Sequence, residues 1–379
     1  MQPSTFVDSA RRMLTEVILP FWMTRMVDAR GGFYGRIDGC GNVHPEAVKG
    51  AVLNARILWT FAAAYRVMGD SAYLATATRA KRTLIDTFID PQFGGVFWSV
   101  NPDGTPCDTK KQIYALGFAI YGLSEYARAT GDEEALTHAV RLFDVIETHS
   151  RDLGQNGYFE AFARDWSPLD DVRLSDKDAN ERKTMNTHLH ILEPYTNLYR
   201  VWPDARLAEA IRNLIGIFTG HILDPQTHHL RLFFHDDWTP TDGRTSYGHD
   251  IEASWLLHEA ALVLSDPDIL RHVEPTVRSI ASHADFDALR VAAQWWEYAE
   301  TVVGYLNIWQ HWGDDEAYRR AVETWDFIGR YLVDPAGGEW YWSVHLPDYA
   351  PNLTDDKAGF WKCPYHNSRA CLEIIERLH

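Results

Sequence analysis

The chain has 379 residues, of which 46% are hydrophobic and 23% charged, as in an ordinary globular protein. Its formal net charge of −17 argues against nucleic acid and anionic membrane surfaces as partners, because both attract basic surfaces. No apolar run approaches the roughly 20 residues of a membrane helix, and no signal peptide is recognisable. The four cysteines lack a CxxC spacing, so we expect reduced thiols and a cytoplasmic location.

Periodic apolar spacing predicts about twelve helices. In chain order they cover residues 5–23, 48–68, 71–88, 110–129, 132–148, 184–201, 204–221, 249–264, 267–283, 289–311, 314–332 and 362–378. A unit of roughly 50–65 residues recurs, in which one helix ends at Gly-Asp or Pro-Asp and a second helix follows. A turn rich in Pro and Gly then leads into a short aromatic strand, which predicts small β-hairpins.

Six helix pairs could form an open solenoid or a closed ring. The histidine motifs described below lie in different copies of the repeat, and a ring would bring them to one mouth. We therefore expect an all-α fold, an (α/α)6 barrel with short β-hairpins in its loops, and a single catalytic domain over residues 1–379. The polar stretch 165–183 is the best candidate for a flexible active-site loop.

Three separated motifs combine histidines with aromatic or acidic residues. They read Asn186-Thr-His188-Leu-His190, Ser246-Tyr-Gly-His249-Asp-Ile-Glu252 and Trp361-Lys-Cys-Pro-Tyr-His366-Asn-Ser-Arg369. The chain also holds 15 Trp, 17 Tyr and 17 Phe, and indole rings suit the apolar faces of sugars. We interpret the motifs as one pocket that transfers protons on a neutral polar molecule, and we expect that molecule to be a sugar.

Helical spacing groups several of these side chains. Asn186, His190 and Glu193 share one face, whereas His188 lies roughly 200° from His190 around the helix, so the two histidines cannot chelate one metal. His190 is the stronger functional candidate of the two, and the alternative for both is a satisfied core histidine. His249 and Glu252 are three residues apart, and a carboxylate there would orient the imidazole and raise its basicity.

Other candidates have structural alternatives of similar weight. Trp296 and Glu300 share a face but could be a core residue and a surface residue. Arg56, within an apolar stretch, is either half of a buried pair or a ligand to sugar oxygens, and Tyr114 is a weaker case of the same kind. We expect Arg369 at a pocket rim. No Gly-x-Ser-x-Gly, phosphate-binding or dinucleotide motif appears, and neither a metal nor a cofactor is expected.

The motifs resemble those of the N-acylglucosamine 2-epimerase superfamily, most closely its cellobiose 2-epimerase branch. The resemblance runs over most of the chain, through Gly31-Gly-Phe-Tyr-Gly35, residues 58–66, 186–190 and 248–255, Trp295-Trp296 with Ala299-Glu300, and residues 361–366. It implies an (α/α)6 barrel that interconverts the glucose and mannose configurations at C2 of the reducing-end unit of β-1,4-linked disaccharides. The partner would be a small sugar, and the enzyme a monomer or homodimer.

The resemblance also implies roles for individual residues. His249 and His366 match the two general acid/base histidines, and His190 matches a third histidine linked to ring opening. The candidate substrate-binding or supporting residues are Arg56, Tyr114, Asp178, Asn186, Glu252, Trp296, Glu300 and Trp361. Asp178 enters because the loop Ser175-Asp-Lys-Asp178 looks like that of the disaccharide enzymes. Glu297-Tyr298 departs from the family pattern after the paired Trp and puts substrate length in doubt.

Several rival functions remain open from the sequence. A D-mannose/D-glucose 2-epimerase or an aldose–ketose isomerase would use the same chemistry, since an enediolate can also be reprotonated at C1. An N-acylated amino sugar epimerase fits the residue pattern less well. An inverting glycoside hydrolase could use Glu252 and Glu300 if their carboxylates lay about 6.5–9.5 Å apart. A non-catalytic glycan-binding module would need the Trp residues but not the histidines.

Overall fold

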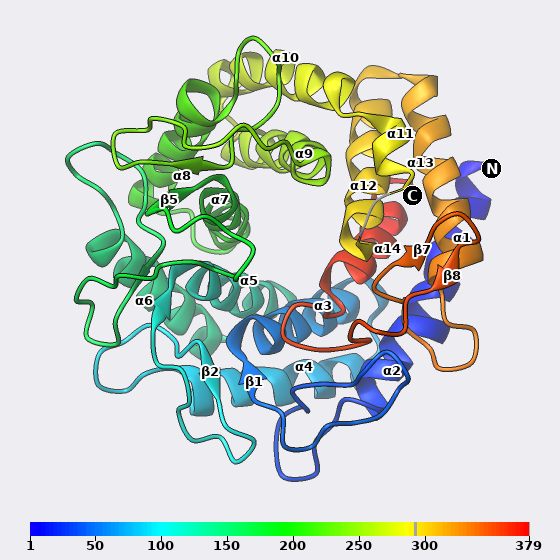
Figure 1. Cartoon of the computed structure of the whole chain (residues 1–379), viewed down its shortest axis with the longest axis horizontal. Helices are drawn as coiled ribbons and strands as arrows, with labels where there is room; N and C mark the ends of the chain where they lie inside the picture. The colour runs from blue at the N-terminus through cyan, green and yellow to red at the C-terminus, as the bar shows by residue number, and fades with distance from the viewer. Residues whose placement is uncertain (292–293, 379) are drawn as a thin grey trace.

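Six helices form a closed inner ring in the computed structural model, which describes residues 1–291 and 294–378. Each inner helix packs against the next, and the last packs against the first (Figure 1). The inner helices are α3 (Ala51–Met68), α5 (Ile113–Thr130), α7 (Met185–Tyr199), α9 (Tyr247–Leu264), α12 (Trp295–Trp312) and α14 (Tyr365–Arg377).

An outer layer of six helices surrounds this ring, each packed on one inner helix (Figure 1). It consists of α1 (Pro3–Arg12), α4 (Ser71–Thr83), α6 (Glu133–His149), α8 (Ala205–Ile217), α10 (Pro267–His283) and α13 (Asp315–Phe327). In the sixth pair α1 covers α14, so opposite ends of the sequence close the ring. The predicted (α/α)6 barrel is therefore confirmed.

Burial differs between the layers as the sequence pattern requires. In the inner helix α5 every residue from Ile113 to Ala127 is buried, because helices surround it on both sides. The outer helix α10 buries only one stripe, formed by Val273, Val277, Ile280 and Ala281. A helix that is apolar all round belongs inside a fold, and an amphipathic one belongs on its surface.

The junctions between paired helices follow the predicted Gly-Asp rule. Glycines with φ near +70° end three inner helices, and the next aspartate accepts a hydrogen bond from a backbone N–H of the following helix. These junctions are Gly69-Asp70, Gly131-Asp132 and Gly313-Asp314. The predicted helix over 289–311 is wrong at its start. A short helix α11 (Phe286–Leu289) precedes, and α12 begins at Trp295 after its Gln294 cap.

Four outer helices contain or end in a π-helical turn. The turn η1 (Met13–Ile18) joins α1 to α2 (Leu19–Thr24), and the others end α4, α8 and α13. They are η2 (Leu84–Phe88), η3 (Phe218–Ile222) and η4 (Ile328–Leu332). After each of the last three turns the backbone becomes extended and pairs across a Pro- or Gly-containing turn, as in the bridge between Ile89 and Val96.

Short antiparallel strand pairs lie in the loops, as expected. They are β1 (Lys49–Gly50) with β2 (Ser99–Val100), β3 (Lys111–Gln112) with β4 (Ala161–Phe162), β5 (Lys183–Thr184) with β6 (Phe233–Phe234), and β7 (Val344–His345) with β8 (Ala350–Pro351). The last pair is a hairpin. In the other three pairs, the first strand directly precedes an inner helix and the second comes from the loop that follows the next outer helix.

A buried lysine–aspartate pair recurs beside these strands. The ammonium groups of Lys49, Lys111 and Lys183 bond to Asp28, Asp90 and Asp152 at 2.8, 2.8 and 2.7 Å, and Lys357 bonds to Asp334. Each aspartate follows an outer helix and each lysine precedes an inner one. The ion pairs therefore fix the loops over the N-terminal ends of the inner helices.

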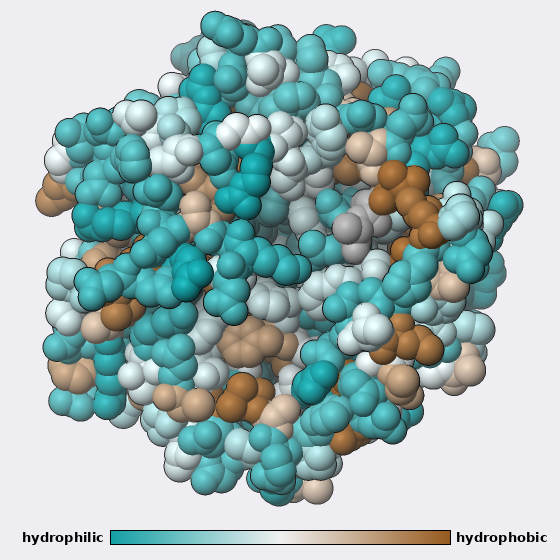
Figure 2. All heavy atoms as spheres, viewed as in Figure 1, coloured by the Kyte–Doolittle hydropathy of each residue, from teal (hydrophilic) through white to brown (hydrophobic). Residues whose placement is uncertain are grey.

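Viewed along the ring axis, the molecular surface is mostly hydrophilic around a central hollow (Figure 2). Within the described residues, no helix has both the length and the apolar character that crossing a bilayer requires.

Candidate active site

A cavity of about 440 Å³ opens at the N-terminal ends of the inner helices. Tyr114, Asn186, Trp296 and His366 are each the second residue of an inner helix, and His249 is the third of its helix. The repeat thus delivers one side chain after another to the same mouth. Ten of the eleven predicted site residues line the cavity: Arg56, Tyr114, Asp178, Asn186, His190, His249, Glu252, Trp296, Trp361 and His366. The eleventh, Glu300, lies behind His366.

The three candidate histidines each have a partner at Nδ1. His190 bonds to Glu193 at 3.0 Å, His366 to Glu300 at 2.7 Å, and His249 to the Ser246 hydroxyl at 2.7 Å. Because a held Nδ1 fixes the ring, Nε2 is the atom left to meet a molecule in the cavity.

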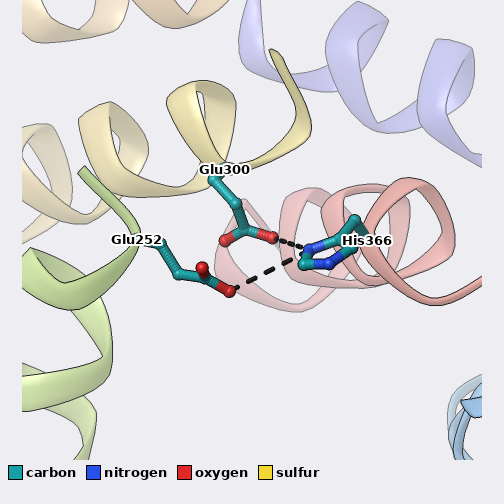
Figure 3. Close-up of side chains that lie close together, drawn as sticks. All are labelled: Glu252, Glu300 and His366. Atoms are coloured by element: carbon teal, nitrogen blue, oxygen red, sulfur yellow. Dashed lines mark hydrogen bonds and ion pairs between the residues drawn. The ribbon is translucent and has the colours of Figure 1, made fainter. Parts of the chain in front are cut away.

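The predicted pairing of His249 with Glu252 is wrong. Ser246 is the N-cap of α9 and its hydroxyl reaches His249 instead. Glu252 faces His366, whose Nδ1 is 3.9 Å from its carboxylate (Figure 3). The carboxylates of Glu252 and Glu300, from α9 and α12, both point toward this one imidazole on α14 (Figure 3).

Arg369 lies beneath the cavity floor and is fully buried, which corrects the prediction of a rim position. Its Nη2 donates to Glu252 at 2.9 Å and to Glu300 at 2.6 Å. Its Nη1 donates to Glu193 and to the Tyr365 hydroxyl. One guanidinium therefore contacts all three carboxylates of the floor, two of which hold histidines.

Burial changes the proton affinities of these groups in opposite directions. It lowers the pKa of His190 and His366, and that of His249 to about 3, because an uncharged imidazole loses less on leaving water. Burial raises the pKa of Glu252 far above its usual value, and neighbouring Glu300 raises it further. The pKa of Glu300 is also raised by burial.

Glu193 behaves differently from the other two carboxylates. Burial again acts to raise its pKa, but the Arg369 charge and the bonds from His190 and Tyr365 outweigh it, and the pKa falls to about 2. The floor thus combines Glu193, whose pKa is lowered, with Glu252 and Glu300, whose pKa values are raised.

Oxygens of Glu252 and Glu300 and a nitrogen of His366 lie within 4.8 Å of one another, a spacing that could hold a metal ion. Arg369 Nη2 already donates to both carboxylates, so a guanidinium supplies positive charge at this place. The donor set is therefore engaged by the protein itself.

Arg56 provides a second cation on the cavity wall. It donates to the Tyr114 hydroxyl at 2.8 Å and to Cys363 Sγ at 3.5 Å, and its guanidinium lies 4.1 Å from the Phe118 ring centre. In the part of the chain that the structure describes, it forms no ion pair with a carboxylate. A buried cation held by neutral groups suits a ligand oxygen that gains negative charge.

Two buried acceptor atoms of the cavity residues lack a hydrogen-bond partner within residues 1–291 and 294–378. They are Asn186 Oδ1 and Glu252 Oε2, the latter 4.0 Å from His190 Nε2. Buried acceptors are almost always hydrogen-bonded in native proteins, so these two indicate a ligand rich in hydroxyl donors.

Indole rings supply the apolar walls. The Trp296 ring centre is 4.7 Å from that of His249 and 5.7 Å from that of His366, so Trp296 lies beside both histidines. Trp361 lies 6.1 Å from Tyr114 on another part of the wall. Such rings accept the C–H faces of a sugar.

The remaining wall comes from the polar loop that the sequence predicted over the site. Leu174 to Asp178 line the cavity, and Asp178 is oriented by the backbone N–H and hydroxyl of Ser175, both at 2.8 Å.

His188 does not line the cavity. It is buried, accepts from the Tyr158 N–H at 2.9 Å, and has its pKa lowered to about 4 by burial, as a core histidine would.

Sequence reasoning missed several residues of the site. Gln294, Trp295 and Trp342 line the cavity, and Ser246 and Tyr365 hold site residues. Ser246 carried a usable signal, since a serine three residues before a histidine at a helix start is an N-cap pattern. The others depend on contacts between distant segments.

Residues 32–370 match the N-acylglucosamine 2-epimerase (GlcNAc 2-epimerase) family. The chain is 57% identical to a cellobiose 2-epimerase of Bacteroides fragilis, over 96% of this chain and 97% of that protein. The structure of cellobiose 2-epimerase from Bacillus thermoamylovorans B4167 superposes with a TM-score of 0.93 and 40% identity, covering 99% of this chain and all of that one. A D-mannose isomerase of Marinomonas mediterranea is 20% identical over 96% of this chain. The chain belongs to the N-acylglucosamine 2-epimerase family.

Proposed function

We propose that this protein is a sugar 2-epimerase that interconverts the glucose and mannose configurations at C2 of the reducing-end residue of β-1,4-linked disaccharides, converting cellobiose to glucosyl-mannose. One observation carries the proposal. Two histidines with held Nδ1 atoms, His249 and His366, line one cavity beside the Trp296 ring. Inversion at a C–H carbon needs a base on one face and an acid on the other, and this pair can supply both.

The first step is ring opening. His190 and its partner Glu193 move a proton between O1 and the ring oxygen, which frees the aldehyde. The aldehyde acidifies the C2 proton. Asn186 Oδ1 and Glu252 Oε2, which lack hydrogen-bond partners among the described residues, accept hydrogen bonds from sugar hydroxyls and fix the sugar.

The second step inverts C2. One histidine takes the C2 proton through Nε2, and the electron pair left on carbon spreads to O1 as an enediolate. Arg56 stabilises the negative charge on O1. The other histidine delivers a proton to the opposite face of C2, and the sugar leaves as its epimer.

The His366–Glu300 pair accounts for the proton that His366 donates as an acid and for its return to the base form. As an acid, His366 carries its proton on Nε2 while Nδ1 accepts from a protonated Glu300. Once Nε2 has donated, the Glu300 proton moves to Nδ1 and leaves a carboxylate, which is the base form. Burial raises the pKa of Glu300, which favours the uptake of the proton that the acid form requires. His249, held by a neutral serine, takes up the C2 proton when His366 donates one. Before the next turnover His249 releases its proton to solvent and the His366–Glu300 pair takes one up.

The similarity pattern favours a disaccharide over a free hexose. Identity is 57% to a cellobiose 2-epimerase and 20% to a D-mannose isomerase. An inverting hydrolase is disfavoured because the potential ligand atoms of Glu252 and Glu300 lie within 4.8 Å, closer than the roughly 6.5–9.5 Å of an inverting pair. We also propose that residues 1–379 form a single domain, which the closed inner ring supports. The cytoplasmic location and the monomeric or homodimeric state stay predictions.

The test is carbon and proton NMR of cellobiose, and separately of mannose, incubated with the enzyme in D2O containing EDTA. We expect glucosyl-mannose with deuterium at C2. Turnover of mannose alone would move the enzyme to the monosaccharide branch, and release of glucose would make it a hydrolase. His249→Asn and His366→Asn should abolish C2 exchange, and substantial exchange in both variants would refute the two-histidine mechanism.

A further inference from the structure

The cavity floor is organised around one arginine that no bound molecule would touch. Arg369 is completely buried on α14, and its guanidinium lies between the Trp255 and Tyr365 rings, 4.7 and 4.3 Å from their centres. Its Nη atoms donate to three carboxylates from three different helices: Glu193 of α7, Glu252 of α9 and Glu300 of α12.

Two of these carboxylates also bond to histidines, one through its second oxygen and the other through the same oxygen that meets Arg369. Glu193 meets Arg369 through Oε1 and His190 through Oε2. Glu300 Oε1 meets both Arg369 and His366, while its Oε2 accepts from Trp255 Nε1 at 3.0 Å. Arg369 is thus connected through a single carboxylate to each of two imidazoles that face the cavity.

We infer that Arg369 is the positioning residue that keeps Glu193 and Glu300 available as carboxylates and so sets which nitrogen of His190 and His366 carries the proton. The inference rests on the proposed function. A carboxylate accepts from Nδ1–H and leaves the Nε2 lone pair facing the cavity, ready to act as a base. A protonated carboxyl would donate to Nδ1 and leave Nε2–H, and that form cannot take a proton from a sugar.

The charges require such a cation. Three carboxylates that are at most 3% exposed lie in the floor, and Arg369 is the cation that bonds to all of them. The other charged or titratable groups facing them are the three site histidines, Arg56 and the phenols of Tyr114, Tyr121 and Tyr365. An unpaired carboxylate at such a position takes up a proton rather than keep its charge.

Arg377 offers a matched control. It lies two helical turns further along α14, is 9% exposed, bonds to Glu373 at 2.6 Å and lies 5.9 Å from the Trp255 ring centre. It lines a separate cavity of about 770 Å³ at the C-terminal ends of the inner helices. It bonds to none of the three floor carboxylates, so Arg377→Met removes a comparable buried cation without changing the histidine partners.

The experiment compares wild type, Arg369→Met, Arg369→Lys and Arg377→Met. For Arg369→Met we expect kcat at pH 7 to fall by about 10²–10⁴-fold, as when a catalytic histidine is left in the wrong tautomer. The acid limb of the kcat profile should move to higher pH, because the carboxyls then need a higher pH to ionise. Arg369→Lys keeps the charge but bonds to fewer partners, so its limb should lie between the two.

A second readout does not depend on turnover. In substrate-free enzyme labelled with ¹⁵N-histidine, wild type should show His190 and His366 protonated at Nδ1, and Arg369→Met should show both protonated at Nε2. If Arg369→Met does not fold, the Lys variant decides on the same readouts. Unchanged tautomers and an unmoved acid limb would overturn the inference, as would an equal shift in Arg377→Met. Absent C2 exchange in wild type would instead refute the proposed function.

Discussion

Glu160 should make the protein less stable as the pH rises through neutrality. Its carboxyl is 1% exposed and accepts hydrogen bonds from Thr184 and Thr187 at 2.8 and 2.7 Å. No cation bonds to it in the described part of the chain, and burial raises its pKa from 4.5 to about 7. Glu160→Gln keeps the shape but cannot ionise; its amide oxygen can accept from one threonine hydroxyl while its amide NH2 donates to the other.

The sign follows from proton linkage. Below pH 4.5 the folded and unfolded chains both hold this proton, and the stability is complete. Between pH 4.5 and 7 the unfolded chain releases the proton first, so the wild type loses stability. The gap between 4.5 and about 7 corresponds to about 3 kcal/mol, at roughly 1.4 kcal/mol per pKa unit. Glu160→Gln should escape this loss.

Urea unfolding of wild type and Glu160→Gln at pH 5 and pH 8.5 measures the difference. We expect the variant to gain about 2.5 kcal/mol on wild type between the two pH values, because wild type has already lost part of the total at pH 5. Glu209→Gln, at an exposed position of α8, is the control and should run parallel to wild type. Parallel curves for Glu160→Gln as well would show that this carboxyl titrates normally in the folded protein and would refute the reasoning.

Three further predictions follow from the site and the loops. Ser246→Ala should lower kcat by about tenfold, because His249 loses its Nδ1 partner, and should cost about 1 kcal/mol of stability, because α9 loses its cap. Kinetics measure the first effect and urea unfolding the second, and an unchanged kcat would exclude an orienting role for Ser246. Glu300→Gln should reduce kcat/KM by about 10–100-fold, since an amide cannot accept from His366, Arg369 and Trp255 together, and a wild-type value would separate Glu300 from catalysis. Lys111→Met should destabilise the fold by about 3–5 kcal/mol in urea unfolding, because the buried Asp90 loses its fully buried partner. A loss below about 1 kcal/mol would show that Arg164 alone can neutralise Asp90.

Much of the barrel could be predicted because its repeats are marked locally. A glycine that ends one helix and an aspartate that caps the next are neighbours in sequence, so a pattern such as Gly69-Asp70 needs no knowledge of the fold. The start of α12 could not be predicted in the same way. Apolar residues around 289 continue the helical spacing in the sequence. In the structure, however, helix α11 ends at Leu289 and helix α12 begins at Trp295.

The same distinction between local sequence signals and contacts between distant segments applies to the site residues. Its members were predictable as residue types because each inner helix presents them near its start. Their partners were not, since Arg369 meets carboxylates from α7, α9 and α12, and helical spacing carries no information about other helices. Glu252 illustrates the point: its spacing suggested His249, but the packing of α14 brings His366 and Arg369 to it instead.

The pairing of α1 with α14 has a consequence for biosynthesis. Helix α1 is synthesised before α14, the helix on which it packs, and its buried Phe6 also contacts Tyr318 and Trp325 of the late helix α13. At roughly 5–20 residues per second, α14 follows on the order of tens of seconds later. During that interval the nascent barrel is an open arc with an uncovered first helix and without His366. Closure of the ring and the arrival of His366 therefore coincide, so a chain that stalls on the ribosome before residue 365 lacks both.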